Sequence, residues 1–88
     1  MKKQIVMVGR DQVEALQLSD RLFLTVTEYH GRKQPTLTIY RPTRYDTAEE
    51  NVLRTWEPQA GLSMWKSDFM ALVQGTEPIE DFLRERGV

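Results

Sequence analysis

The sequence predicts a small α+β domain in which a β-sheet comes first and a helical segment follows. Two observations lead to this fold class. Between residues 16 and 40 apolar and polar side chains alternate with the period of two that strands require, whereas from residue 65 onward apolar residues recur at helical spacing. Strand-like and helix-like stretches are segregated along the chain, as is typical of α+β domains. We expect one domain over residues 1–88, comprising an N-terminal strand or arm (1–15), a sheet (16–64) and a helical segment (65–86).

The N-terminal part predicts little regular structure. Residues 4–8 are rich in β-branched side chains and form either a first strand or an arm, which Gly9 ends. The polar run 10–15 predicts no element of its own. Residues 16–18 alternate as a short strand does, and the Ser-Asp pair at 19–20 supplies a turn.

A β-hairpin over residues 21–45 forms the centre of the predicted sheet. Its two alternating arms are joined by a short turn that contains Gly31 and Pro35. One face is aliphatic and suits a core, while the other carries hydroxyls and aromatic rings. The aliphatic face comprises Leu22, Leu24, Val26, Leu37 and Ile39, and the opposite face comprises Phe23, Thr25, Thr27, Tyr29, Thr36, Thr38 and Tyr40.

Basic residues gather around the aromatic face of this hairpin. Rings stack on unpaired bases and cations follow phosphates, so such a surface suits single-stranded nucleic acid. Two simpler interpretations stay open: the tyrosines pair across strands, and the turn cations are solvated. The residues expected to contact DNA are Thr27, Tyr29, His30, Arg32, Lys33, Tyr40, Arg41, Arg44, Tyr45 and Arg54.

After the hairpin the strand signals are weaker. Pro42 blocks further ladder pairing, so the second arm ends or bulges there. Residues 43–51 predict a hydrophilic loop and residues 52–56 a returning strand. Pro58 and Gly61 then predict a break, after which residues 62–64 form either an edge strand or the lead-in to a helix.

Two helices are expected at the C-terminal end. The first has an apolar stripe, which we expect to be buried in the core or at a subunit interface rather than to bind a ligand. Gly75 ends it, and Thr76 is the expected N-cap of the second helix. The first stripe comprises Trp65, Phe69, Leu72 and Val73, and the second Ile79, Phe82 and Leu83.

Composition narrows the function classes. The chain has no cysteine and one histidine, so we expect neither a disulfide framework nor a metal site, and no cofactor. No nucleophile motif or phosphate-cradling glycine loop indicates an enzyme. The net charge of -1 argues against binding duplex DNA by bulk positive charge. No apolar run has the length of a secretion signal or a membrane span, so we expect a cytoplasmic protein.

Three short motifs resemble those of a known family. They are LTVTEYHG at residues 24–31, LTI at 37–39, and GLSM at 61–64, which leads into a helix with an aromatic residue on its first buried turn. Over residues 16–83 the chain resembles the positive-cofactor-four family of transcriptional coactivators, which has bacterial and phage relatives.

The resemblance implies a four-stranded curved antiparallel sheet backed by a C-terminal helix, a Whirly-like single-stranded-DNA-binding fold. It implies a homodimer paired through the helices. It also implies binding of single-stranded DNA or melted duplex without sequence specificity, in support of replication, recombination or transcription. The dimer interface would comprise Trp65, Phe69, Leu72 and Val73.

Some positions match the family pattern and others depart from it. By the resemblance, Tyr29 is the stacking aromatic residue, and His30 and Arg32 are the hairpin-turn cations. Tyr40 stands where the family has an arginine, and the pair at 59–60 (Gln-Ala) stands where the family has two basic residues. Arg54 and Trp56 are candidates to compensate for the missing charge.

Two further functions are weighed against DNA binding. The acidic residues within 46–57 and the modest net charge suit a small dimeric adaptor that binds protein without nucleic acid. Single-stranded RNA would use the same aromatic and cationic surface as DNA. Steep salt dependence of oligonucleotide binding separates nucleic-acid binding from the adaptor function.

Overall fold

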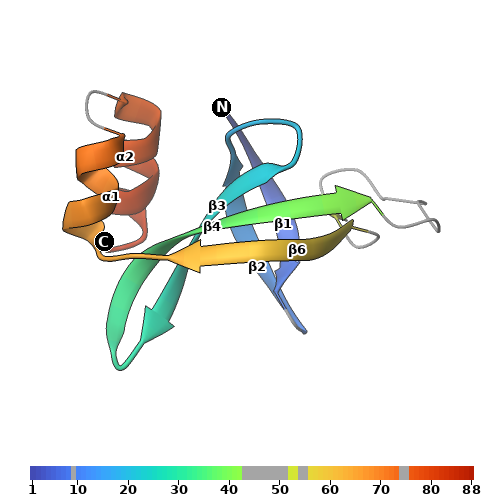
Figure 1. The fold of residues 1–88 in the computed structure, drawn as a ribbon, viewed down its shortest axis with the longest axis horizontal. Coiled ribbons are helices and arrows are strands. Elements are labelled where there is room, and N and C mark those ends of the chain that lie inside the picture. Colours follow the sequence, from blue (N-terminus) through green and yellow to red (C-terminus); the bar gives the residue numbers. More distant parts are fainter. Residues whose placement is uncertain (9, 43–51, 54–55, 74–75) are drawn as a thin grey trace.

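The structure is a computed structural model that describes residues 1–8, 10–42, 52–53, 56–73 and 76–88. The described part forms one sheet in the order β5-β1-β2-β3-β4-β6 and two helices that lie at one end of it (Figure 1). Neighbouring strands are antiparallel, except that β5 pairs in parallel with β1. The elements are β1 (Lys2–Val8), β2 (Asp11–Gln17), β3 (Leu22–Tyr29), β4 (Arg32–Pro42), β5 (Val52–Leu53), β6 (Trp56–Ser63), α1 (Lys66–Leu72) and α2 (Glu77–Glu85).

The α+β class is confirmed, but the expectation of a four-stranded sheet is wrong. β1 and β2 pair along their whole length, where only a short strand at 16–18 was expected. Val13 and Ala15 alternate with polar neighbours, and Ala15 is fully buried, so the run that looked merely polar is a strand with one solvated face. The N-terminal residues are therefore part of the sheet.

β3 and β4 form the expected hairpin, with a different turn. The turn residues are His30 and Gly31, whose positive φ values of 50° and 74° fit a type I′ turn. Pro35 is not in the turn but inside β4, opposite Val26. Proline has no N–H, but the hydrogen bonds between β3 and β4 are not affected, because the backbone groups of Pro35 face away from β3. The Pro35 carbonyl accepts a hydrogen bond from the Met64 N–H at 3.3 Å.

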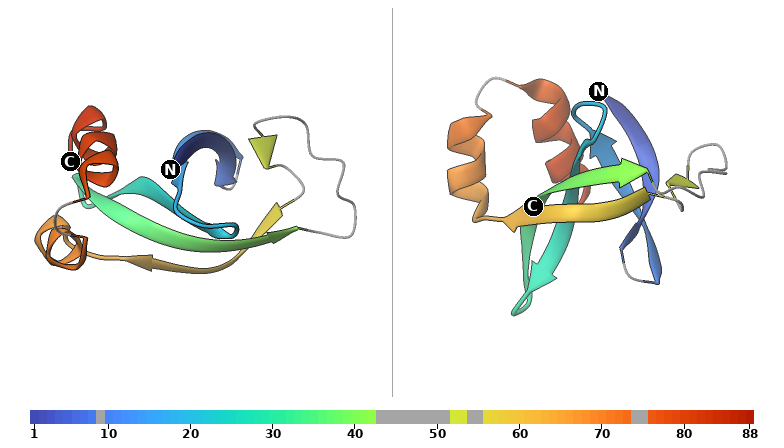
Figure 2. Two further views of the ribbon diagram at one scale, coloured as in Figure 1. Left: turned by 90° about the horizontal axis from the view of Figure 1, so that it is seen from above. Right: turned by 45° about the vertical axis from the view of Figure 1, so that its right-hand side comes forward.

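The sheet is strongly curved, so side chains are buried on both of its faces (Figure 2). The helices cover one face, where Leu24 and Val26 pack as the aliphatic face predicts. On the opposite face Phe23 packs with side chains of β1 and β2, which the curvature brings over β4. The buried cluster under the helices comprises Leu16, Leu24, Phe69, Ile79, Phe82 and Leu83, and the second cluster comprises Val6, Ala15, Phe23 and Tyr40.

β6 continues through the segment where a break was expected. Pro58 and Gly61 both pair with β4, and the register shift between them leaves Gln59 as an extra residue. Proline is tolerated here because β6 is the last strand of the sheet. A returning strand was expected over residues 52–56. In the structure, residues 52–53 form β5, and β6 begins at residue 56.

Both predicted helices are present. Thr76 occupies the N-cap position of α2, although its side chain makes no capping hydrogen bond. Phe69 is 1% exposed and packs in the core of a single chain, so its assignment to a dimer interface is wrong. Leu72, in contrast, is 73% exposed. Among the described residues, no helix is long and apolar enough to cross a membrane.

Salt bridges attach α2 to the first hairpin. The Lys3 ammonium lies 3.0 Å from a carboxylate oxygen of Glu85 and lowers the pKa of that carboxyl. Arg86, just after the helix, lies 3.1 Å from Glu14 and packs over the Phe82 ring. Both ion pairs connect the C-terminal end of α2 with the hairpin formed by β1 and β2.

Candidate nucleic-acid interface

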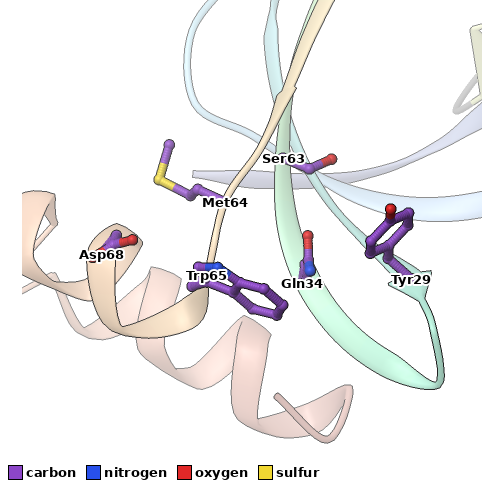
Figure 3. A pocket seen from close by; sticks show the side chains of 6 residues that line it. All are labelled: Tyr29, Gln34, Ser63, Met64, Trp65 and Asp68. Atoms are coloured by element: carbon purple, nitrogen blue, oxygen red, sulfur yellow. The ribbon is translucent and has the colours of Figure 1, made fainter.

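A groove lined by two exposed aromatic rings lies where the sheet meets α1, and we call it the aromatic groove (Figure 3). Its volume is about 600 Å³. Tyr29 is 59% exposed and Trp65 46% exposed, and the Gln34 side chain lies between the two rings in Figure 3. The lining residues are Tyr29, Gln34, Ser63, Met64, Trp65 and Asp68.

Local backbone geometry explains how the two rings come together. Tyr29 is the last residue of β3, with its side chain on the sheet face opposite the helices. Trp65 is extended, with φ of -65° and ψ of 145°, and occupies the position just before α1. Because Thr36 pairs with Ser63, continuing the register brings residue 65 level with Gln34. The indole therefore reaches the open face of the hairpin.

A chain of three hydroxyls crosses the same face. The Thr27 and Thr36 hydroxyls share a hydrogen bond of 2.6 Å, and Thr36 and Ser63 share one of 2.8 Å. Each hydroxyl can donate or accept a hydrogen bond, so the donor–acceptor direction along this row of hydroxyls can reverse. Ser63 also lines the aromatic groove, which thus has a polar wall able to match either a donor or an acceptor.

Beyond Trp65 lies a second hollow, the cationic groove, lined by Arg32, Lys33, Trp65, Lys66, Ser67 and Met70. The Arg32 guanidinium carbon lies 4.6 Å from the centre of the Trp65 ring, within cation–π range. Lys33 Nζ donates to the Arg86 carbonyl at 3.0 Å, and Lys66 Nζ donates to the Val88 carbonyl at 2.7 Å. These bonds position both ammonium groups and leave each with further donors.

His30 extends the aromatic surface at the hairpin tip. It is exposed, and its ring packs edge-on against Tyr29, with 4.2 Å between ring centroids. The predicted cluster of Tyr29, His30 and Arg32 is thus assembled at one end of the sheet. Thr27 joins it through the hydroxyl chain.

Tyr40 is a correction to the predicted site. Its ring is 2% exposed and packs edge-on against Phe23, with centroids 5.3 Å apart. The phenol donates a hydrogen bond to the Met7 carbonyl at 3.3 Å, and burial raises its pKa. A ring buried in this way cannot stack on a base, so Tyr40 is a core residue.

Of the remaining predicted DNA contacts, the structure describes Arg41, which does not join this cluster. Arg41 is exposed near the far end of β4, and strand alternation places it on the opposite sheet face from Arg32, beside its cross-strand neighbour Glu57. Arg44, Tyr45 and Arg54 lie outside the described residues.

Trp65 and Lys66 line the candidate grooves, although neither is among the residues expected to contact DNA. Trp65 was assigned to a buried stripe on helical spacing, but it precedes the first turn of α1. The signal that could have revealed it is its position two residues after the strand that pairs with β4. Asp68, in the first turn of α1, adds a carboxylate to the aromatic groove.

The arrangement offers no metal site in the described part of the chain, where no three metal-ligating side chains come together. No protein-family model, curated protein or solved structure matches this chain. Function is therefore inferred from the two grooves and from the chain's own residues.

Proposed function

We propose that this protein binds single-stranded DNA, with little sequence preference, through the aromatic and cationic grooves. The observation that carries the proposal is the position of Trp65, which is shared by both grooves. On one side of it lies the exposed Tyr29 ring, and on the other lie three basic residues. Base stacking on an aromatic side chain contributes about 1–3 kcal/mol per base and is tolerant of sequence.

The charges suggest how a nucleotide would be oriented. Phosphate is disfavoured in the aromatic groove by the Asp68 carboxylate and favoured in the cationic groove by Arg32 and Lys66. Bases would therefore stack on the exposed rings of Tyr29 and Trp65 while the backbone follows the cations. The Ser63 hydroxyl in the wall of the groove can donate or accept a hydrogen bond, which agrees with weak sequence preference.

Single strands fit this surface better than duplex DNA. The ring faces of a base become available for stacking on side chains only when the base is unstacked from its neighbours. The net charge of -1 gives the protein no general attraction for the dense charge of a duplex. By the resemblance to the positive-cofactor-four family, the binding would serve replication, recombination or transcription in a bacterial or phage-infected cytoplasm.

A titration of labelled oligonucleotides tests the proposal. Fluorescence anisotropy should show tighter binding to an oligothymidine than to a duplex of equal length, and an affinity that falls between about 50 and 200 mM salt. Arg32→Gln should reduce the slope of log K against log salt by about 0.7, the value for one phosphate contact on a single strand.

The matched control is Arg84→Gln on α2, where the arginine is exposed and pairs with Asp81. Its salt slope should equal that of the wild type. Equal affinity for single strand and duplex, or an unchanged slope in Arg32→Gln, would refute the proposed surface. Absence of binding to either nucleic acid would favour the adaptor function.

A further inference from the structure

The outer edge of β6 is unpaired among the described residues. β6 is the terminal strand of the sheet, and all of its residues after Trp56 are exposed. An edge strand presents a row of free N–H and C=O groups and is a template for pairing with another strand. Proteins usually protect such edges with charge or proline. Here Glu57 and Pro58 protect the start of β6, but residues 59–63 carry neither.

The hydrogen bonds to β4 show which backbone groups of β6 point outward. The Met64 N–H donates to the Pro35 carbonyl, so the polar groups of residue 64 face β4. In an antiparallel ladder this direction alternates along the strand. Those of Leu62 therefore also face β4, whereas the N–H and C=O groups of Gly61 and Ser63 face away from the sheet.

Apolar side chains accompany this free edge. Leu62 is 58% exposed, and Ile39 on the neighbouring strand is 45% exposed. Both lie on the sheet face that bears the helices, since Leu62 pairs with the core-packed Leu37 and Ile39 lies two residues further along β4. Within the described part of the chain, the edge thus combines unpaired backbone groups with an apolar surface that the helices leave uncovered.

We propose that β6 pairs in antiparallel orientation with β6 of a second copy of this chain, about a two-fold axis at Leu62. In this register Gly61 faces the partner's Ser63, and the outward backbone groups of both residues form four hydrogen bonds across the seam. Leu62 and its copy then form the close, non-hydrogen-bonded pair at the centre, where side chains approach most nearly.

A second copy suits this edge because the surface is complementary to itself. A two-fold interface brings the same patch of both subunits together. The pairing segment has no charged residue, so no like charges meet at the axis, and Glu57 lies at the opposite end of β6. The apolar face of each copy extends the apolar face of the other.

This dimer would also enlarge the DNA-binding surface, a consequence that rests on the proposed function. A two-fold axis perpendicular to the sheet keeps corresponding faces on one side. Both aromatic grooves would then open in the same direction, with Ser63 of each groove next to the seam. One single strand could engage both sites, and such linkage raises affinity without new contacts.

The oligomeric state, measured by light scattering without DNA, tests the interface independently of DNA binding. We expect a dimer for the wild type and a monomer for Leu62→Lys, which places two ammonium groups together at the axis. Leu72→Lys is the matched control, because Leu72 is an exposed leucine on α1 and belongs to the helix-mediated interface implied by the family resemblance. It should remain dimeric.

Cysteine cross-linking tests the register. The chain has no cysteine, so single substitutions give no background. Leu62→Cys should form a disulfide-linked dimer on mild oxidation, since Cα atoms about 4.5 Å apart suit a disulfide. Ala60→Cys should not, because the two copies would be separated by about 13 Å along the strands. A monomeric wild type, loss of the dimer in Leu72→Lys alone, or cross-linking at 60 instead of 62 would each overturn the proposal.

Discussion

Replacing Trp65 by alanine should lower the affinity for single-stranded DNA by about 5- to 150-fold. The ring is about half exposed and lies between the bases and the phosphates of the proposed complex. Loss of one stacking platform costs about 1–3 kcal/mol, which corresponds to this range. Tyr29→Ala should have an effect of the same order. The measurement is an anisotropy titration at fixed salt, with circular dichroism to show that the variants are folded.

Two comparisons separate stacking from other causes. Trp65→Phe retains an aromatic face and should recover most of the lost affinity. The salt slope of Trp65→Ala should stay near that of the wild type, because no phosphate contact is removed, whereas Arg32→Gln changes the slope. Wild-type affinity in both alanine variants, or a phenylalanine variant as weak as the alanine variant, would contradict a stacking role.

Phe69→Ala should lower the free energy of unfolding by about 3–5 kcal/mol, because it leaves a cavity in the main core. Phe69 is 1% exposed and packs in the cluster that includes Leu24 and Phe82. Small domains have only about 5–15 kcal/mol of stability, so this loss is a large fraction of the total. Urea denaturation monitored by circular dichroism measures it.

Leu72→Ala is the control on the same helix, since its side chain is 73% exposed. It should change stability by no more than about 0.5 kcal/mol. If Phe69→Ala kept full stability but dissociated a dimer, Phe69 would be an interface residue, as the family resemblance first implied. A large loss of stability in Leu72→Ala would show that α1 packs differently.

Local sequence patterns predicted much of the fold. Period-two alternation located the β3–β4 hairpin and its aliphatic face, and helical spacing located α1 and α2. Only the end of β2 was predicted, because along the rest of the strand the inward-facing residues are Val13 and the small Ala15, which stand among polar neighbours. The turn was misplaced because Pro35 was taken as a turn signal, although its missing N–H is tolerated inside β4.

The candidate site could be predicted only in part. Tyr29 and Arg32 lie together because they are paired neighbours at the hairpin end, which alternation and turn geometry determine. Tyr40 lies on the same face by alternation, but it is buried through contacts with distant residues such as Met7. Trp65 enters the site because the chain turns there from β6 into α1. Sheet curvature and such turns depend on long-range packing, which periodicity does not report.

Quenching of Trp65 fluorescence tests the central claim most directly. The chain has two tryptophans, and Trp56→Phe leaves Trp65 as the only one while keeping an aromatic ring in the second core. An oligothymidine should quench this emission in parallel with the rise in anisotropy, because a base stacks on the indole, and equal amounts of duplex should have little effect. Binding of the oligothymidine that leaves Trp65 emission unchanged would place the DNA elsewhere and contradict the proposed site.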